Sequence, residues 1–173
     1  MKFLSKFLIA IVVLLSVTNS FTQISKAEIV ATGLTCSMCS NAINKQLKKL
    51  PEVENVAIDL NTNTFTISLK KNNNISPKIL KESVQKAGFF VGSMIVTMDF
   101  ENQRIDDNFK IKKDNLNLIF IDTNSKTLNG LAKFKVLDKG YLVMKDFKKN
   151  LKNYSKYASY NLDNEDDYHL KPI

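Results

Sequence analysis

Between Glu28 and Met98 the spacing of apolar residues switches between two periods in a fixed order. A short alternating stretch, EIVATG, is followed by a helical pattern, by two more alternating stretches, VENVAIDL and TFTISLK, by a second helical pattern, and by a last alternating stretch, VGSMIVTM. This order predicts strand, helix, strand, strand, helix, strand. Two right-handed crossovers then place both helices on one face of one sheet, which is a ferredoxin-like α+β plan.

The ends of these elements carry matching local signals. Pro51 stops the first helix, Ser76 caps the second with Pro77 at its first position, and Gly88 ends it. The turn NTN at 61–63 joins the two middle strands in a hairpin. The residues that we expect to face the core are Ile29, Ala31, Cys39, Ile43, Leu47, Leu50, Val56, Ile58, Leu60, Phe65, Ile67, Leu69, Ile79, Leu80, Val84 and Ala87.

The first 27 residues have the layout of a secretory signal peptide. Lys2 and Lys6 precede an apolar run at 7–17, and the small residues Ser25 and Ala27 suit cleavage before Glu28. The run is shorter than the roughly 20 residues that a membrane-spanning helix needs. We therefore expect an exported protein, periplasmic or secreted, without a membrane span after cleavage.

Residues 99–173 differ in character from the preceding part. A polar stretch at 101–115 looks like a linker that runs into an edge strand, LNLIFID and TLNGLAKFKV read as strands, and KGYLVMK reads as a returning strand after a turn at 138–140. Asp146 suits a cap for a short helix with Phe147, Leu151 and Tyr154 on one side. We expect a second, small and mostly β domain, for which an OB-like barrel is one candidate.

The charge of the chain gives little support to nucleic-acid binding. The formal net charge is +8. The surplus is spread over both parts of the chain and forms no Arg-rich stripe, so a mildly basic, solvated surface is the simpler interpretation.

The chemistry concentrates at the only two cysteines, Cys36 and Cys39, at the start of the first predicted helix. Residues three apart on a helix face the same way, so both sulfurs can point to one spot. The unpaired N–H groups and the positive end of the helix dipole favour the thiolate form, which binds metal. Two soft sulfurs without a nearby third ligand suit Cu(I) best. Hg(II) or another soft metal also fits, whereas Zn(II) needs four ligands.

Other ligands are scarce. The sole histidine, His169, lies far downstream, and we expect it to be exposed or partly packed near the C-terminus rather than to bind metal. Met38, between the cysteines, is expected to pack into the core, with only a minor role for its thioether.

The segment GLTCSMC, residues 33–39, together with this order of elements, resembles the heavy-metal-associated domain. That family includes copper chaperones, the metal-binding domains of copper-transporting ATPases and the periplasmic mercury-binding protein. Leu34 stands where a methionine is customary, which is a mild, volume-conserving change. The resemblance extends to KAGFFVGSM and implies that Phe89 lies near the metal loop, either as an aromatic cover or as a plain core residue. It spans about residues 28–98.

These features predict an exported soft-metal-binding protein rather than an enzyme. The role that they favour is Cu(I) binding or trafficking through Cys36 and Cys39, with a metal transporter or acceptor protein as a candidate partner. Three alternatives stay open: a periplasmic mercury-binding protein, a thiol-disulfide redox protein and a structural disulfide. Redox catalysis is disfavoured because Pro51 and Pro77 are both used at helix ends, which leaves no proline to face the sulfurs.

Overall fold

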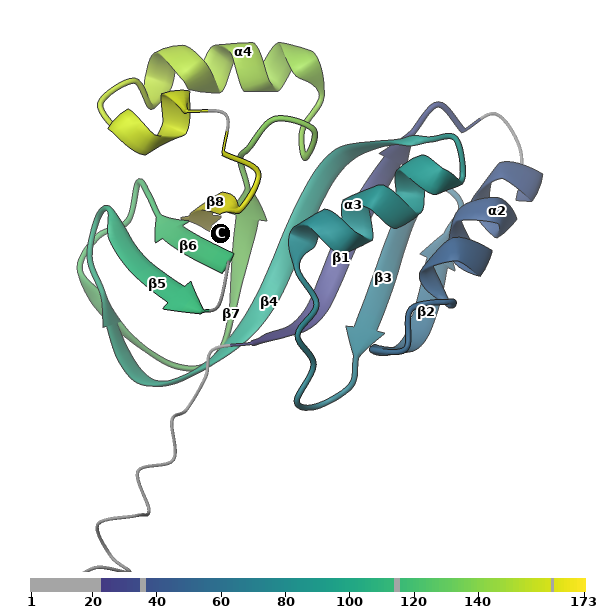
Figure 1. Ribbon diagram of the computed structural model, residues 1–173, viewed down its shortest axis with the longest axis horizontal. Coiled ribbons are helices and arrows are strands. Elements are labelled where there is room, and N and C mark those ends of the chain that lie inside the picture. The colour runs from purple at the N-terminus through teal and green to yellow at the C-terminus, as the bar shows by residue number, and fades with distance from the viewer. Residues whose placement is uncertain (1–22, 35–36, 114–115, 163) are drawn as a thin grey trace, which may run out of the picture.

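The computed structural model describes residues 23–34, 37–113, 116–162 and 164–173. Its strands belong to one eight-stranded sheet with the order β2-β3-β1-β4-β7-β8-β6-β5 (Figure 1). The elements are β1 (Ile24–Thr32), α2 (Ser37–Leu47), β2 (Val53–Asp59), β3 (Thr64–Leu69), α3 (Pro77–Lys86), β4 (Phe90–Ile105), β5 (Phe109–Lys113), β6 (Leu116–Phe120), β7 (Lys126–Val136), α4 (Met144–Asn153), the 3-10 helix η1 (Ala158–Asn161) and β8 (Asp167–Pro172).

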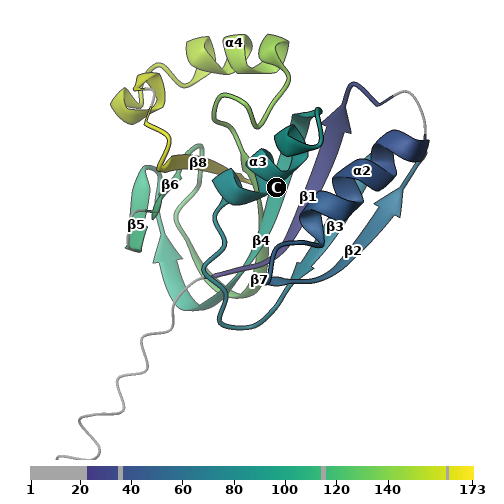
Figure 2. The same ribbon diagram turned by 45° about the vertical axis from the view of Figure 1, so that its right-hand side comes forward.

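The N-terminal half has the predicted ferredoxin-like plan. The strands β2, β3, β1 and β4 lie side by side, and every neighbouring pair among them is antiparallel. Helices α2 and α3 cover one face of these strands, as the two views in Figures 1 and 2 show. This arrangement puts the end of β1 and the start of α2 together at one end of the half.

Most of the expected core residues are buried. In β3 the exposure alternates along the strand, and Phe65, Ile67 and Leu69 face inward. The two helices contribute buried side chains to the same core, namely Ile43 and Leu47 of α2 and Leu80 and Val84 of α3. Two predictions were wrong, since Leu60 at the hairpin and Ile79 at the start of α3 are both exposed.

The helix α3 confirms the local signals at its ends. The Ser76 hydroxyl accepts a hydrogen bond from the Ile79 N–H at 3.4 Å, and Pro77 is the first helical residue. Gly88, just beyond the helix, has φ +87°, a left-handed conformation that glycine adopts at little cost. The chain thereby turns directly into β4.

Strand β1 begins earlier than the expected domain start at Glu28. Ile24 and Ala27 are 3% and 0% exposed, and Ile24 pairs with Met98 of β4. The Asn73 side-chain amide donates to the Ile24 carbonyl at 3.0 Å. Residues 24–27, which the sequence assigned to the signal peptide, are therefore part of the folded unit. The remainder of that segment, residues 1–22, lies outside the described residues.

The prediction that a linker begins after Met98 was wrong, because strand β4 continues through this part of the chain. It runs for 16 residues, and β7 pairs with it from Ile95↔Lys135 to Ile105↔Lys126. The polar residues at 101–104 misled the prediction, because an exposed strand segment is held by backbone pairing and needs no apolar side chains. A register shift between Phe100 and Gln103 accommodates this segment.

The C-terminal half is not an OB-like barrel. Among the described strands, β2 and β5 stand at the two ends of the sheet order, so the sheet stays open. Strand β8 lies between β7 and β6 and is parallel to β6. The expected returning strand KGYLVMK is mostly a turn and the start of α4, with one isolated bridge between Leu142 and Ser93. The residue that caps α4 is Val143, and Asp146 lies in its first turn.

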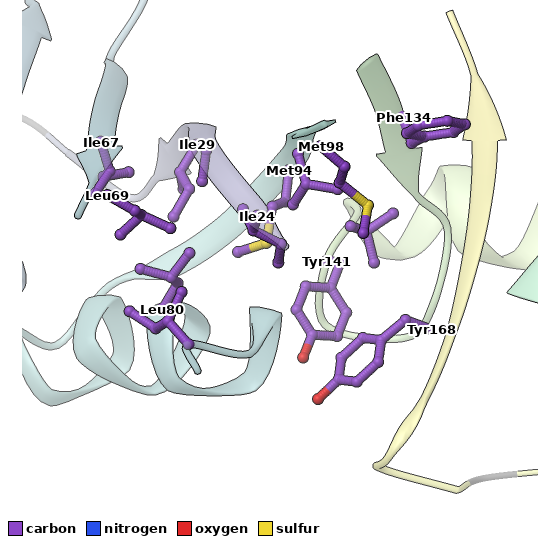
Figure 3. Close-up of a cluster of buried hydrophobic side chains, with 14 of the residues drawn as sticks. Ile24, Ile29, Ile67, Leu69, Leu80, Met94, Met98, Phe134, Tyr141 and Tyr168 are labelled. Atoms are coloured by element: carbon purple, nitrogen blue, oxygen red, sulfur yellow. The ribbon is translucent and has the colours of Figure 1, made fainter. Parts of the chain in front are cut away.

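A continuous hydrophobic core joins the two halves. Figure 3 shows Ile24, Met94 and Met98 between the N-terminal core and the rings of Tyr141 and Tyr168. The two tyrosine rings meet edge to face with centroids 5.9 Å apart. The halves therefore share one packed interior as well as one sheet.

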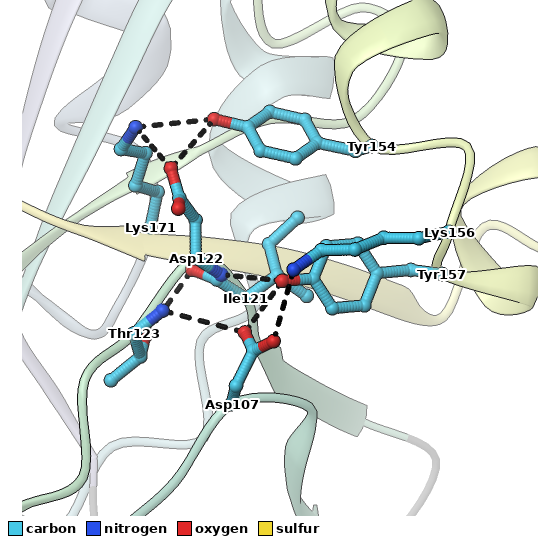
Figure 4. A network of polar contacts seen from close by, with 8 residues as sticks. All are labelled: Asp107, Ile121, Asp122, Thr123, Tyr154, Lys156, Tyr157 and Lys171. Atoms are coloured by element: carbon cyan, nitrogen blue, oxygen red, sulfur yellow. Dashed lines mark hydrogen bonds and ion pairs between the residues drawn. The ribbon is translucent and has the colours of Figure 1, made fainter.

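A second cluster lies under α4 and η1. Tyr154, Tyr157 and Tyr160 pack there with Phe147 and Leu151, which confirms the predicted inner side of the helix. A polar network borders this cluster (Figure 4). In it, the Tyr157 hydroxyl donates to Asp107 at 2.5 Å and accepts from the Asp122 N–H at 2.9 Å, while Lys171 pairs with Asp122. Within the described part of the chain, no helix has the length and apolar character required to cross a membrane.

Candidate metal centre

Cys39 lies in the first turn of α2, as its third residue. Its side chain is half-buried. The first turn carries no acidic residue, so no carboxylate opposes a negative charge at this helix end. The unpaired N–H groups of a first turn favour negative charge. The other predicted ligand, Cys36, lies outside the described residues, as does Thr35.

The first turn of α2 has one side that packs against the core and one side that is exposed to solvent. Ser40 and Ile43 are 3% and 0% exposed and anchor the helix to the core, and Leu34 packs partly against the same core. The packing of Leu34 is the role that the family resemblance implies for this position. Leucine fills it without a polar atom, so the change from methionine is structurally mild.

Phe89 lies at the base of the metal loop. Gly33, at the start of that loop, has φ +88°, and a Cβ added there would lie 3.8 Å from Cδ1 of the Phe89 ring. Phe89 is half-buried and packs against the core. Phe89 therefore lies next to Gly33, the residue that follows β1, and contributes to the core.

Two exposed apolar side chains flank the loop. Met38 is 80% exposed, so the prediction that it packs into the core was wrong. The reason is helical spacing: Met38 lies one position away from the stripe of Cys39, Ile43 and Leu47, and therefore points away from the sheet. Phe90, which pairs with Thr32 at the end of β1, is 66% exposed. The exposure of Phe90 was not predictable from the sequence, because an apolar residue at the start of a strand is equally compatible with the core.

His169 is neither exposed nor close to Cys39. It lies on β8, which β7 and β4 separate from β1, and its side chain is 1% exposed. Its Nδ1 lies 2.6 Å from Asp138 Oδ1, and its Nε2 lies 2.9 Å from Ser159 Oγ. Burial raises the pKa of the Asp138 carboxyl, and the hydrogen bond from His169 opposes that rise. His169 therefore ties β8 to the turn after β7 and to η1.

Among the described residues, no group of three or more His, Cys, Asp or Glu side chains has the arrangement of a metal site.

Comparison with known proteins identifies the N-terminal half. The heavy-metal-associated domain model matches residues 29–90. The probable copper-transporting ATPase HMA5 of Arabidopsis thaliana is 33% identical over 66 residues, which make up 38% of this chain and 6% of that protein. The chain thus corresponds to a small part of the length of this relative.

Solved structures give similar matches. The Ccc2a domain of the yeast copper transporter, described in apo and Cu(I)-loaded states, is 33% identical, covers 37% of this chain and 86% of its own, and has a TM-score of 0.34. The complex of Atx1, Cu(I) and Ccc2a also matches, with 33% identity, 37% and 86% coverage and a TM-score of 0.33.

The N-terminal domain of a potential copper-translocating P-type ATPase from Bacillus subtilis, in the Cu(I)-loaded state, is 34% identical, covers 39% of this chain and 82% of its own, and has a TM-score of 0.35. The similarity to the heavy-metal-associated domain thus lies within residues 29–90 of this chain.

Proposed function

We propose that this protein is an exported Cu(I) carrier that binds one ion between Cys36 and Cys39. The observation that carries the proposal is the position of Cys39 in the first turn of α2, directly beyond the loop at the end of β1. Cys36 lies three residues upstream in the sequence, and the match to the heavy-metal-associated domain covers both cysteines.

The charge of the complex suits this location. Two thiolates and one Cu(I) carry a net charge of −1, which the N–H groups at the start of α2 stabilise. Cu(I) is soft and accepts low coordination numbers, so two sulfurs are sufficient. Phe89, which packs next to Gly33, supplies an apolar surface close to the start of this loop.

Copper loading of the reduced chain tests this proposal. We expect the protein, kept under anaerobic conditions with a reductant, to bind one Cu(I) per chain in competition with a chromophoric chelator. Cys36→Ser and Cys39→Ser should each lower the affinity by at least about 1000-fold, because a single thiolate cannot hold the ion in the way that two do.

Met38→Leu is the matched control, since it removes the neighbouring sulfur of an exposed side chain and should leave the stoichiometry and affinity unchanged. Unchanged copper binding in the two cysteine variants would overturn the assignment. Titration with Hg(II) addresses the mercury alternative, and a positive insulin reduction assay with dithiothreitol would favour the redox alternative.

Trafficking and export extend the same proposal. The matched yeast domain occurs in a complex with Atx1 and Cu(I), which supports an acceptor or transporter domain as the partner of this chain. The exposed Met38 and Phe90 beside the loop offer apolar contacts to such a partner. The signal-like N-terminus supports action beyond the inner membrane, in the periplasm or outside the cell.

A further inference from the structure

The outer side of helix α4 carries a stripe of lysines. Lys145, Lys148, Lys149 and Lys152 are all exposed. Residues separated by three, four and seven positions lie on one side of an α-helix, so the four ammonium groups share one face. We call these four residues the lysine face.

The packing of α4 fixes the direction of this face. Phe147 and Leu151 on the opposite side pack against the cluster that contains Tyr154, Tyr157 and Tyr160. The helix therefore cannot rotate to bury or redistribute its lysines, and the face points permanently into solvent.

The positive charge of the lysine face is not neutralised within the described part of the chain. None of its four lysines takes part in an ion pair there, whereas Lys156 pairs with Asp107 and Lys171 pairs with Asp122. Asp146 is the only acidic residue of the helix. The four lysines therefore form a uniform positive surface that is available to an outside partner.

Exposed apolar side chains stand at one end of the same helix. Val143, which precedes the helix, is 40% exposed, and Met144, its first residue, is 52% exposed. On an anionic membrane surface, exposed lysines are attracted to the headgroups, and exposed apolar side chains such as Val143 and Met144 can enter the boundary with the acyl chains.

The position of α4 determines at which end of the molecule the lysine face lies. Figures 1 and 2 place α4 at the outer end of the molecule, the same end at which β1 finishes and α2 begins. A surface that meets the lysine face therefore also lies at the end of the molecule where β1 finishes and α2 begins.

We propose that the lysine face docks the protein onto an anionic lipid surface. A lipid bilayer fits better than a protein or nucleic acid because the face is a convex stripe of lysines without arginine. Lysine acts as a compact point charge that suits diffuse negative surfaces, whereas recognition of fixed acidic or phosphate geometry favours the planar fork of arginine. The inference goes beyond metal binding and does not depend on it.

Vesicle sedimentation tests the proposal with the whole chain and without metal. The probes are vesicles of phosphatidylcholine alone and of phosphatidylcholine with 30% phosphatidylglycerol. We expect binding only to the anionic vesicles, and weaker binding at 0.5 M salt than at 0.05 M salt, because the Debye length falls from roughly 14 Å to about 4 Å. Each lysine near such a surface contributes a factor of about five to partitioning.

A charge-matched pair of variants locates the contact. The variant with Lys145→Gln, Lys148→Gln, Lys149→Gln and Lys152→Gln should bind anionic vesicles more than about 100-fold less tightly. A control with Lys70→Gln, Lys71→Gln, Lys110→Gln and Lys112→Gln removes four exposed lysines elsewhere and should bind nearly as well as the unmodified chain. Equal losses in the two variants would mean that net charge alone causes binding, and would overturn the proposal.

A fluorescent variant tests the orientation separately. The chain contains no tryptophan, so Met144→Trp introduces a single indole at the end of the lysine face. Its emission should shift to shorter wavelength on addition of anionic vesicles. An unshifted spectrum, or binding to soluble polyglutamate without binding to the vesicles, would overturn the assignment to lipid.

Discussion

Tyr157 holds three segments of the C-terminal half together through one hydroxyl group. Tyr157 lies between α4 and η1, and its side chain is almost fully buried. Its hydroxyl donates a hydrogen bond to Asp107 and accepts one from the Asp122 N–H (Figure 4). Asp107 follows β4, and Asp122 follows β6. This single contact therefore fixes two loops against the second hydrophobic cluster.

Replacing this tyrosine should destabilise the protein measurably. Tyr157→Phe keeps the ring but leaves the Asp122 N–H without its partner and removes the hydrogen bond to Asp107, so we expect the free energy of unfolding to fall by about 1 to 3 kcal/mol. Urea unfolding followed by circular dichroism measures the change.

Tyr154→Phe is the control for this substitution. The Tyr154 hydroxyl makes only long contacts, 3.3 Å to Asp122 and 3.2 Å to Lys171, so its loss should cost less than about 0.5 kcal/mol. A cost for Tyr154→Phe that equals or exceeds the cost for Tyr157→Phe would contradict the role given to Tyr157.

The residues of the candidate metal centre show which properties of single residues can be predicted from the sequence. Cys39 was placed correctly because a helix start is marked by local spacing, and Phe89 because the family resemblance carries its position. The direction of Met38 depends on which side of the helix meets the sheet, and the burial of His169 depends on Asp138 and Ser159, which are 31 and 10 residues away. Contacts of that kind leave no local pattern in the chain.

The proposed export requires a cleavage site, and strand β1 limits where that site can lie. Cleavage before Glu28 would delete Ile24 and Ala27, both buried, together with the hydrogen bond from Asn73 to the Ile24 carbonyl. Burial of an isoleucine side chain alone contributes roughly 1.5 to 3 kcal/mol. We therefore expect cleavage upstream of Ile24. A cut after Ser20 leaves strand β1 complete. It also places the small residues Thr18 and Ser20 before the cleavage site, as in the usual processing pattern.

Intact mass and N-terminal sequencing of the exported protein check this prediction, with the first residue expected at or before Gln23. In parallel, a chain that starts at Glu28 should unfold at a lower urea concentration than one that starts at Gln23. An exported protein that begins at Glu28 and is equally stable would show that the start of β1 is dispensable.

The elements of residues 28–98 were predictable because their signals are local: alternation in β3, the Ser76 cap and Pro77 in α3, and Gly88 at its end. Beyond Met98 the same approach failed at β4, whose outer segment is polar, and at residues 141–143, which do not return as a strand. Those outcomes depend on pairing with β7 and packing under α4, which are contacts between distant segments.

The whole molecule should lose stability in acid. The hydrogen bond from Lys133, with help from Lys26, lowers the pKa of Glu28, and the bond from Lys171 lowers the pKa of Asp122. For Asp107, burial acts in the opposite direction, but the hydrogen bonds from Tyr157 and Lys156 outweigh it, and its pKa is also lowered.

A carboxyl group with a lowered pKa in the folded state stabilises the fold above its unfolded pKa of about 4, and this contribution disappears as the pH falls through the lowered value. Since the partners are surface groups, we expect the three carboxylates to contribute about 1 to 2 kcal/mol together. Urea unfolding at pH 7 and pH 3 should show a loss of this size. Asp122→Asn should reduce the difference between the two pH values, and an unaltered difference would exclude Asp122 as a contributor.

Strand β4 passes through both halves of the sheet without interruption, with β1 on one side and β7 on the other. The two halves consequently have no hinge between them. Whatever surface α4 meets, the angle between that surface and the start of α2 is set when the chain folds. A partner of α2 must therefore approach along one fixed direction, because no flexible connection lets the two halves reorient.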